Sequence, residues 1–345
     1  MIGVSHATEQ RLELHGPIVL GGGERLERCT VGLRSHGDPS APAVVVLGGI
    51  SAGRQVAAAP GETAPGWWEE FVGAGRAVDT DRLHVVGLDW LGGRGWTSGP
   101  ADSAAANGPV EVTSDGPAVS GASGDSFPAI STRDQARVFL AALRQHGVEE
   151  VAAVVGSSYG GMVGLAMAEE APERIGRLVV ISAAERSHPM ATGLRALQRQ
   201  VIALAQGAGR EAEGLAIARG IAMTTYRTAR EFDERFDSPE AVCGYLASRG
   251  QRFAEEWPAA SYLCLSESLD RHCVEPSGLT TPLTLVGVTS DTLVPPWQIR
   301  SLARRYGGPV TLHWLASRYG HDAFLKETTA LGRLLRGALY KVNCQ

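Results

Sequence analysis

Three polar residues that lie far apart in the chain have the types and sequence surroundings that nucleophilic catalysis requires. Ser158 is the central residue of Gly156-Ser-Ser-Tyr-Gly160, which follows an apolar run at residues 151–155. Small residues then recur at helical spacing, so the stretch predicts a strand, a sharp turn and a helix. Such a G-x-S-x-G turn exposes its serine hydroxyl above the sheet, and its glycines avoid Cβ collisions with the neighbouring strand and helix. The motif predicts that Ser158 is a nucleophile.

A serine hydroxyl is a poor nucleophile at neutral pH, so it needs a histidine to take its proton and an acid to orient the imidazole. Asp291 comes just after a buried-type strand at residues 282–288, and His321 comes just after the next strand, at 310–315. Taken singly, Asp291 fits a turn or helix cap equally well, and His321 fits a surface loop. The order Ser, Asp, His is that of α/β-hydrolase folds, and together with Ser158 it favours a catalytic triad.

Two backbone N–H groups are candidates for an oxyanion hole. Residues 43–47 form an apolar run that leads directly into Gly48-Gly49. In an α/β-hydrolase fold the loop after this early strand supplies one donor, and the residue after the nucleophile supplies the other. The matching positions are Ile50 and Tyr159. By itself, the Gly-Gly pair is also consistent with an ordinary tight turn.

The elements around these residues alternate between strands and helices, with one long interruption. Residues 1–40 predict edge strands in an antiparallel start to the sheet, and later strands and helices alternate as in a mostly parallel sheet with helices on both faces. From residue 192 to about residue 272 the apolar residues recur at helical spacing, which predicts helices throughout. We therefore predict an α/β-hydrolase core at 1–185 and 276–345, and an inserted helical cap at 186–275. The Ala-, Ser-, Gly- and Pro-rich stretch 101–126 predicts a long mobile loop.

Composition excludes several classes of protein. The chain has 345 residues, 44% of them hydrophobic, so it can bury a large core. A net charge of −5 argues against nucleic acid as a partner. No apolar run approaches the roughly 20 residues that span a bilayer, and no secretory signal is evident. We therefore expect a cytoplasmic protein that does not associate with a membrane. The five cysteines lack the spacing of a zinc site or a disulfide framework, so we expect no metal.

Several longer stretches resemble the homoserine O-acyltransferase family of α/β-hydrolase-fold enzymes, and they extend from about residue 41 to about residue 330. The resemblance implies ping-pong transfer of an acyl group from acyl-CoA, through an acyl-serine, to the hydroxyl of homoserine, as in methionine biosynthesis. It also implies a homodimer, with acyl-CoA as co-substrate and no bound cofactor. The stretches are Gly156-Ser-Ser-Tyr-Gly-Gly-Met162, Phe127-Pro with Thr132-Arg-Asp134, Leu197-Gln-Arg-Gln200, Thr225-Tyr-Arg-Thr228, Ser290-Asp-Thr-Leu-Val-Pro-Pro296 and Gly320-His-Asp-Ala-Phe-Leu325.

An amino-acid acceptor needs a cation for its carboxylate and an anion for its ammonium group. Arg219 and Tyr226 are seven residues apart in a helical segment, so both project from one face and can reach a single carboxylate. These two positions, together with Asp322, match the family's homoserine-binding residues. The resemblance implies that Asp322 receives the ammonium group while His321 activates the acceptor hydroxyl.

Departures from the family pattern surround the expected acyl pocket, so the sequence does not decide which acyl-CoA is the donor. The first oxyanion loop reads Gly-Gly-Ile-Ser-Ala where the family more often has His-Ala-Leu-Thr-Gly. Arg54 or Arg94 is a candidate to accept the free carboxylate of a succinyl group, so both acetyl-CoA and succinyl-CoA remain possible donors. Serine is an alternative acceptor, because one methylene contributes only about 1–3 kcal/mol of discrimination. An esterase is the enzymatic alternative, because the same triad and oxyanion hole also serve water, and a non-catalytic binding protein on the same scaffold is the alternative from another class.

Overall fold

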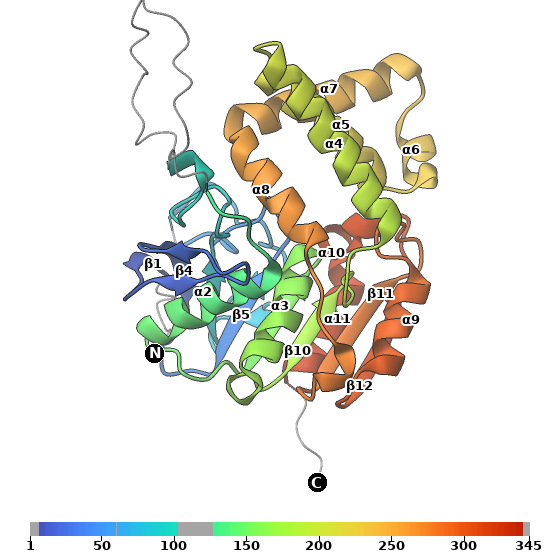
Figure 1. The fold of residues 1–345 in the computed structure, drawn as a ribbon. Coiled ribbons are helices and arrows are strands. Elements are labelled where there is room, and N and C mark those ends of the chain that lie inside the picture. The colour runs from blue at the N-terminus through green and yellow to red at the C-terminus, as the bar shows by residue number, and fades with distance from the viewer. Residues whose placement is uncertain (1–6, 60, 103–126, 341–345) are drawn as a thin grey trace, which may run out of the picture.

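A computed structural model describes residues 7–59, 61–102 and 127–340, and in this part of the chain the central feature is a sheet in the order β1-β4-β8-β5-β9-β10-β11-β12 (Figure 1). β1 and β4 pair antiparallel, as do β4 and β8, and the other neighbours are parallel. The bounds are β1 (Ala7–Glu13), β4 (Thr30–His36), β5 (Ala43–Leu47), β8 (His84–Leu88), β9 (Ala153–Ser157), β10 (Leu178–Ile181), β11 (Leu283–Val288) and β12 (Val310–Leu315).

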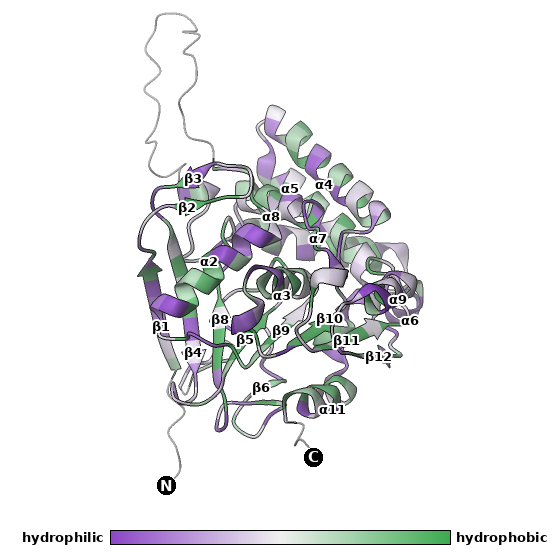
Figure 2. Ribbon diagram, turned by 60° about the horizontal axis from the view of Figure 1, so that its bottom comes forward, coloured by the Kyte–Doolittle hydropathy of each residue, from purple (hydrophilic) through white to green (hydrophobic). Residues whose placement is uncertain are grey.

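The side chains of the central strands face two separate hydrophobic clusters, as expected for a sheet covered on both faces. In β5, Val45 and Leu47 belong to the cluster that contains Phe139 of α2 (Thr132–Gln145). The alternate residues Val44 and Val46 belong to the cluster on the other face. The first cluster includes α3 (Tyr159–Glu170) and the second includes α11 (Thr328–Leu339). Figure 2 shows β10 and β11 largely in the hydrophobic colour, between these layers.

A group of helices interrupts the alternation between β10 and β11 and lies beyond one end of the sheet (Figure 1). Within it, α5 contacts both α4 and α7. The group falls within the segment 186–275 for which a cap was expected. Its members are α4 (Pro189–Gly207), α5 (Glu211–Tyr226), α6 (Ala229–Arg235), α7 (Pro239–Glu256) and α8 (Ala259–Asp270).

The remaining elements are short or follow the expected pattern. Ser131 caps α2 and forms a capping box with Asp134, and α9 (Pro296–Arg305) and α10 (Ala323–Lys326) follow β11 and β12. The first 40 residues supply β1 and β4, which form the expected antiparallel start of the main sheet. One part of that expectation is corrected: β2 (Ile18–Val19) pairs with β3 (Arg25–Leu26) in a separate two-stranded sheet. A second small sheet joins β6 (Val72–Gly73) to β7 (Val78–Asp79).

The mobile loop expected at 101–126 lies almost entirely outside the described residues.

Among the helices that are described, none combines the length and the apolar composition needed to cross a bilayer.

Candidate active site

The turn between β9 and α3 holds Ser158 in a backbone conformation that non-glycine residues rarely adopt. Its φ is 53° and its ψ is −121°. A Cβ atom at Gly156 would lie 2.2 Å from the carbonyl oxygen of Gly160, and one at Gly160 would lie 2.3 Å from the carbonyl oxygen of Leu47. The helix after the serine therefore approaches β5 too closely for any side chain at position 160. The glycines of the motif are needed for the reason expected from the sequence.

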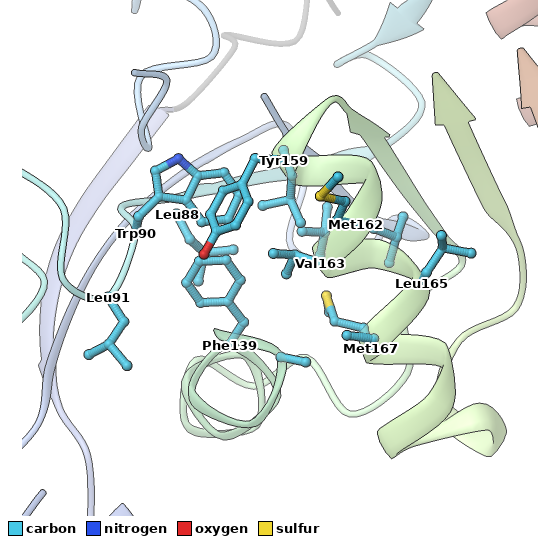
Figure 3. Close-up of a cluster of buried hydrophobic side chains, with 14 of the residues drawn as sticks. Leu88, Trp90, Leu91, Phe139, Tyr159, Met162, Val163, Leu165 and Met167 are labelled. Carbon is cyan, nitrogen blue, oxygen red and sulfur yellow. The ribbon is translucent and has the colours of Figure 1, made fainter. Parts of the chain in front are cut away.

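Buried aromatic residues fix the start of α3 to the loop after β5 (Figure 3). The ring of Tyr159 is fully buried and packs edge-on against Trp90 at 4.8 Å between centroids. Its hydroxyl forms a 2.6 Å hydrogen bond with Ser268 of α8. Trp90 Nε1 in turn donates to the carbonyl oxygen of Gly49 at 3.1 Å. This aromatic pair therefore couples the backbone beside Ser158 to the backbone of the candidate oxyanion loop.

Ser158, His321 and Asp291 form a continuous chain of hydrogen bonds at the carboxyl ends of β9, β12 and β11. Ser158 Oγ lies 2.8 Å from Nε2 of His321, and Nδ1 of His321 lies 2.7 Å from Oδ2 of Asp291. The other oxygen of Asp291 accepts from the backbone N–H groups of Leu293 and Val294 at 2.9 and 3.0 Å. These bonds fix the carboxylate, and the carboxylate fixes the ring.

The environment of His321 suits a general base. Both His321 and Asp291 are buried. Burial lowers the pKa of His321, but the charge and hydrogen bond of Asp291, with a further contribution from the charge of Asp322, outweigh it, so that the pKa is raised from its usual 6.5. The proton taken from a serine hydroxyl would therefore be held more firmly than by a free imidazole.

The backbone N–H groups of Ile50 and Tyr159 are available to a ligand. Neither group donates a hydrogen bond to a backbone or side-chain acceptor within the described part of the chain. Tyr159 is the first residue of α3, so its N–H has no partner inside the helix. Ile50 lines the same pocket as Ser158. Two such donors beside a nucleophile can bind the oxygen anion that forms when a carbonyl is attacked.

Ser158 and His321 open into a cavity of about 550 Å³ between the sheet and the cap. Arg219, Tyr226 and Asp322 also line this cavity, so the structure brings the three expected acceptor-binding residues to one site. The guanidinium carbon of Arg219 lies 4.7 Å from the ring centroid of Phe253 and 5.6 Å from that of Tyr226. Arg219 forms no ion pair with any carboxylate of the described residues. Its charge is thus available to a bound anion.

One charged residue of the site was missed in the sequence. Arg227, which also lines the cavity, donates from Nε to Asp322 Oδ2 at 2.6 Å and from Nη1 to Glu231 at 2.8 Å. The carboxylate expected to receive an ammonium group therefore shares one oxygen with an arginine. The other oxygen, Oδ1, has no hydrogen-bond partner among the residues that the structure describes. Arg227 directly follows Tyr226 in the motif Thr225-Tyr-Arg-Thr228, and that adjacency was the available signal.

The two arginines expected to contact the acyl donor differ in their positions. The expectation for Arg54 is corrected: this residue is not among those lining the cavity. Its guanidinium binds Asp89 at 2.6 Å and Glu9 at 3.2 Å, and it stacks on Trp96. Arg94 does line the cavity, where it pairs with Glu256 at 3.1 Å. No group of three potential metal ligands occurs in the described ranges.

Comparison with known proteins shows which families and sequences this chain is similar to. A sequence profile of the alpha/beta hydrolase fold matches residues 42–328. The chain is 38% identical to the homoserine O-succinyltransferase of Xanthomonas campestris pv. campestris, over 88% of this chain and 77% of that protein. It is 30% identical to the serine O-succinyltransferase of Litchfieldella anticariensis, over 92% and 94%.

Two solved structures share the fold at lower identity. A homoserine O-acetyltransferase from Staphylococcus aureus superposes with a TM-score of 0.82 at 24% identity, covering 99% of this chain and 98% of that one. The esterase E22 superposes with a TM-score of 0.81 at 20% identity, covering 97% and 100%.

Proposed function

Because the chain belongs to the homoserine O-acyltransferase family of α/β-hydrolase-fold proteins, we propose that it transfers an acetyl or succinyl group from acyl-CoA to the hydroxyl of L-homoserine. The observation that carries this proposal is the combination, in one cavity, of a serine–histidine–aspartate relay with an arginine, Arg219, that no carboxylate of the described residues neutralises. The relay supplies the covalent chemistry, and Arg219 supplies a site for an amino-acid carboxylate. An esterase would need only the relay.

In the first half-reaction the thioester acylates Ser158. His321 Nε2 takes the hydroxyl proton while Ser158 Oγ attacks the thioester carbonyl carbon. The N–H groups of Ile50 and Tyr159 bind the resulting oxyanion. The carbon–sulfur bond then breaks, and the imidazolium returns the proton to the leaving thiolate, which departs as free CoA. Asp291 stabilises the imidazolium throughout.

In the second half-reaction the acceptor takes the place of CoA. His321 removes the proton of the homoserine hydroxyl, whose oxygen attacks the acyl-serine carbonyl carbon. Collapse of the second tetrahedral intermediate breaks the bond to Ser158 Oγ, which regains a proton from His321. Arg219 and Tyr226 hold the acceptor's carboxylate, and Asp322 Oδ1 receives its ammonium group. A fixed acceptor competes with water by proximity rather than by greater reactivity.

A thiol-release assay tests the proposal against its alternatives. We expect release of CoA from acetyl-CoA or succinyl-CoA to be strongly stimulated by homoserine. Equal release without homoserine would indicate an esterase, and no release with either thioester would indicate a binding protein. Stronger stimulation by serine than by homoserine would keep the transferase chemistry and change the acceptor.

Substitution of Arg219 by glutamine should affect only the second half-reaction. We expect kcat/KM for homoserine to fall about 100-fold, because the acceptor carboxylate loses its charged partner in a partly desolvated site. The burst of thiol that reports acylation of Ser158 should stay within about twofold of the wild-type rate, because no hydrogen bond or ion pair of the described structure joins Arg219 to the relay. Stopped-flow measurement of the burst and steady-state rates separates the two. An equal loss in both would contradict the acceptor role.

The rim of the cavity suits the phosphates of CoA. Arg249 and Arg252 of α7 line it, are exposed, and form no ion pair in the described structure. They are one helical turn apart, so they present two adjacent positive charges. Lys326 lies on the same rim. Cations in this position would attract a polyanionic thioester before its acyl end reaches Ser158.

Substitution of Arg252 by glutamine should weaken binding of full acyl-CoA only. We expect its KM to rise about 3- to 5-fold, a modest change because the side chain is exposed to solvent. The difference from wild type should shrink in high salt, which screens exposed charges. The matched control is a short N-acetylcysteamine thioester, which carries no phosphate. A similar KM increase for that thioester would assign Arg252 a role other than phosphate binding.

A further inference from the structure

A row of four alternating charges leads from the cavity into the cap. Asp322 Oδ2 accepts from Arg227 Nε at 2.6 Å, and Arg227 Nη1 donates to Glu231 Oε1 at 2.8 Å. Arg235 Nη1 completes the row by donating to the same glutamate oxygen at 3.2 Å. Asp322, Arg227 and Arg235 line the cavity, whereas Glu231 is not among its lining residues. Glu231 therefore influences a ligand in the cavity through its charge and its neighbours, without touching it.

The first three members of the row are shielded from water. The side chains of Asp322, Arg227 and Glu231 are 11%, 9% and 8% exposed, whereas that of Arg235 is 37% exposed. Solvent screens an exposed charge far more than a buried one. Two carboxylates against one guanidinium leave the buried part of the row with one net negative charge. A buried charge that lacks a counterion favours the binding of a cation.

Glu231 decides whether Asp322 keeps its charge for a ligand. Burial lowers the pKa of Arg227, but the charge and hydrogen bond of Asp322, together with the charge of Glu231, outweigh it and raise the pKa. Arg227 is therefore a cation beside Asp322. Without Glu231 these two residues would form a neutral pair, and an ammonium group at Asp322 Oδ1 would share one carboxylate with a guanidinium. With Glu231 present, Arg227 has a counterion of its own.

The position of Glu231 is fixed at the start of α6. Its N–H donates to Oγ1 of Thr228 at 3.1 Å, and that hydroxyl donates to the carbonyl oxygen of Arg318 at 2.5 Å. The hydroxyl thus joins α6 to the loop that carries Asp322. The second carboxylate oxygen of Glu231, Oε2, is buried and has no hydrogen-bond partner among the described residues. Local stability alone does not account for a buried carboxylate with one oxygen left unbonded.

We propose that Glu231 is a positioning residue for the amino-acid acceptor: it neutralises Arg227, so that Asp322 presents a full negative charge to the acceptor's ammonium group. This inference rests on the proposed transfer to homoserine. Glu231 touches neither substrate and takes no part in either covalent step. Its effect is confined to the second half-reaction and, within it, to acceptors that carry an ammonium group.

The first test uses Glu231→Gln, which removes the charge and keeps the size and the oxygen that accepts from Arg227. Under the proposed ping-pong mechanism, kcat/KM for acyl-CoA reports the first half-reaction and kcat/KM for homoserine reports the second. We expect the ratio of the second to the first to fall about 10-fold, because a charge is removed from a shielded site. Both constants scale with the amount of folded protein, so the ratio does not depend on it.

Two acceptor analogues separate the loss of charge from a loss of structure. L-2-Aminobutyrate and butanoate both lack the hydroxyl that is acylated, and only the first carries an ammonium group. In Glu231→Gln we expect the inhibition constant of L-2-aminobutyrate against homoserine to rise about 10-fold. That of butanoate should stay within about twofold or fall, because an uncompensated Arg227 does not repel an anion. A similar rise in both constants would assign Glu231 a structural role and overturn the inference.

The matched control is Asp233→Asn in the same helix. Asp233 is exposed and is not among the residues that line the cavity. This variant should retain the wild-type ratio and both inhibition constants, and a fall equal to that in Glu231→Gln would also overturn the inference. An unchanged ratio in Glu231→Gln would overturn it and leave the acyltransferase proposal standing. Absence of homoserine-dependent thiol release from the wild type would instead overturn the proposed function itself.

Discussion

Replacement of Ser158 by alanine is expected to reduce homoserine-dependent thiol release by about four to six orders of magnitude. The hydroxyl that attacks the thioester is lost, and His321 Nε2 is left without the group it deprotonates. Intact-protein mass spectrometry of the enzyme mixed with acyl-CoA and no acceptor should show an acyl adduct on the wild type and none on the variant. The fold should be unaffected, because alanine at the φ of 53° is no more strained than serine.

The adjacent serine offers a matched control for that result. Ser157 is the last residue of β9, and its hydroxyl is buried without a hydrogen-bond partner in the described structure. Ser157→Ala therefore removes a similar group one residue away without leaving an unsatisfied partner. It should still form the acyl-enzyme and transfer the acyl group. An adduct on Ser158→Ala, or its loss in Ser157→Ala, would refute the covalent role of Ser158.

Replacement of Asp291 by asparagine should lower kcat by about three to four orders of magnitude. The asparagine Oδ1 can keep the bonds from the N–H groups of Leu293 and Val294, so its NH2 group would face Nδ1 of His321. That donor favours the imidazole tautomer with its proton on Nε2, which cannot accept the serine proton. The exposed carboxylate Asp81 gives the control: Asp81→Asn should retain wild-type kcat.

The Asp291→Asn variant also leads to a prediction about the pH dependence of activity. In the wild type His321 must be neutral to act as a base, and its pKa is raised from 6.5, so kcat/KM should rise with pH through a midpoint above 6.5. Burial lowers the pKa, and Asp291 provides the largest opposing effect. Residual activity of Asp291→Asn should therefore rise through a lower midpoint. A midpoint that stays in place or moves upward, measured from about pH 5 to about pH 9, would argue against this account.

The short-range features of this site could be read from the sequence because each has a local cause. The spacing of Gly156, Ser158 and Gly160 reflects contacts within one turn and one neighbouring strand. Asp291 and His321 lie in the segments that follow β11 and β12, and parallel strands bring their carboxyl ends to one edge of the sheet. The helical spacing of apolar residues also predicted the helices between β10 and β11.

The ion pairs could not be predicted, because their partners are distant in the chain and depend on how the layers pack. Arg54 pairs with Asp89, Arg227 with Asp322, and Arg195 with Asp270. The sequence shows only that an arginine is near a motif, and it does not show which carboxylate competes for it. Arg54 follows the candidate oxyanion loop, yet its guanidinium is occupied by Asp89. Arg195 lies two residues before the motif Leu197-Gln-Arg-Gln200, and Asp270, its partner, lies 75 residues further along the chain.

The position of the cap in the chain also affects the protein while it is being synthesised. Ser158 leaves the ribosome before the cap helices α4–α8, and Asp291 and His321 leave it after them. β11 and β12, which carry those two residues, join the sheet at its edge beside β10. Under the proposed mechanism, an incomplete nascent chain therefore displays Ser158 without the groups that activate it, so it should not react with thioesters until the final strands have docked.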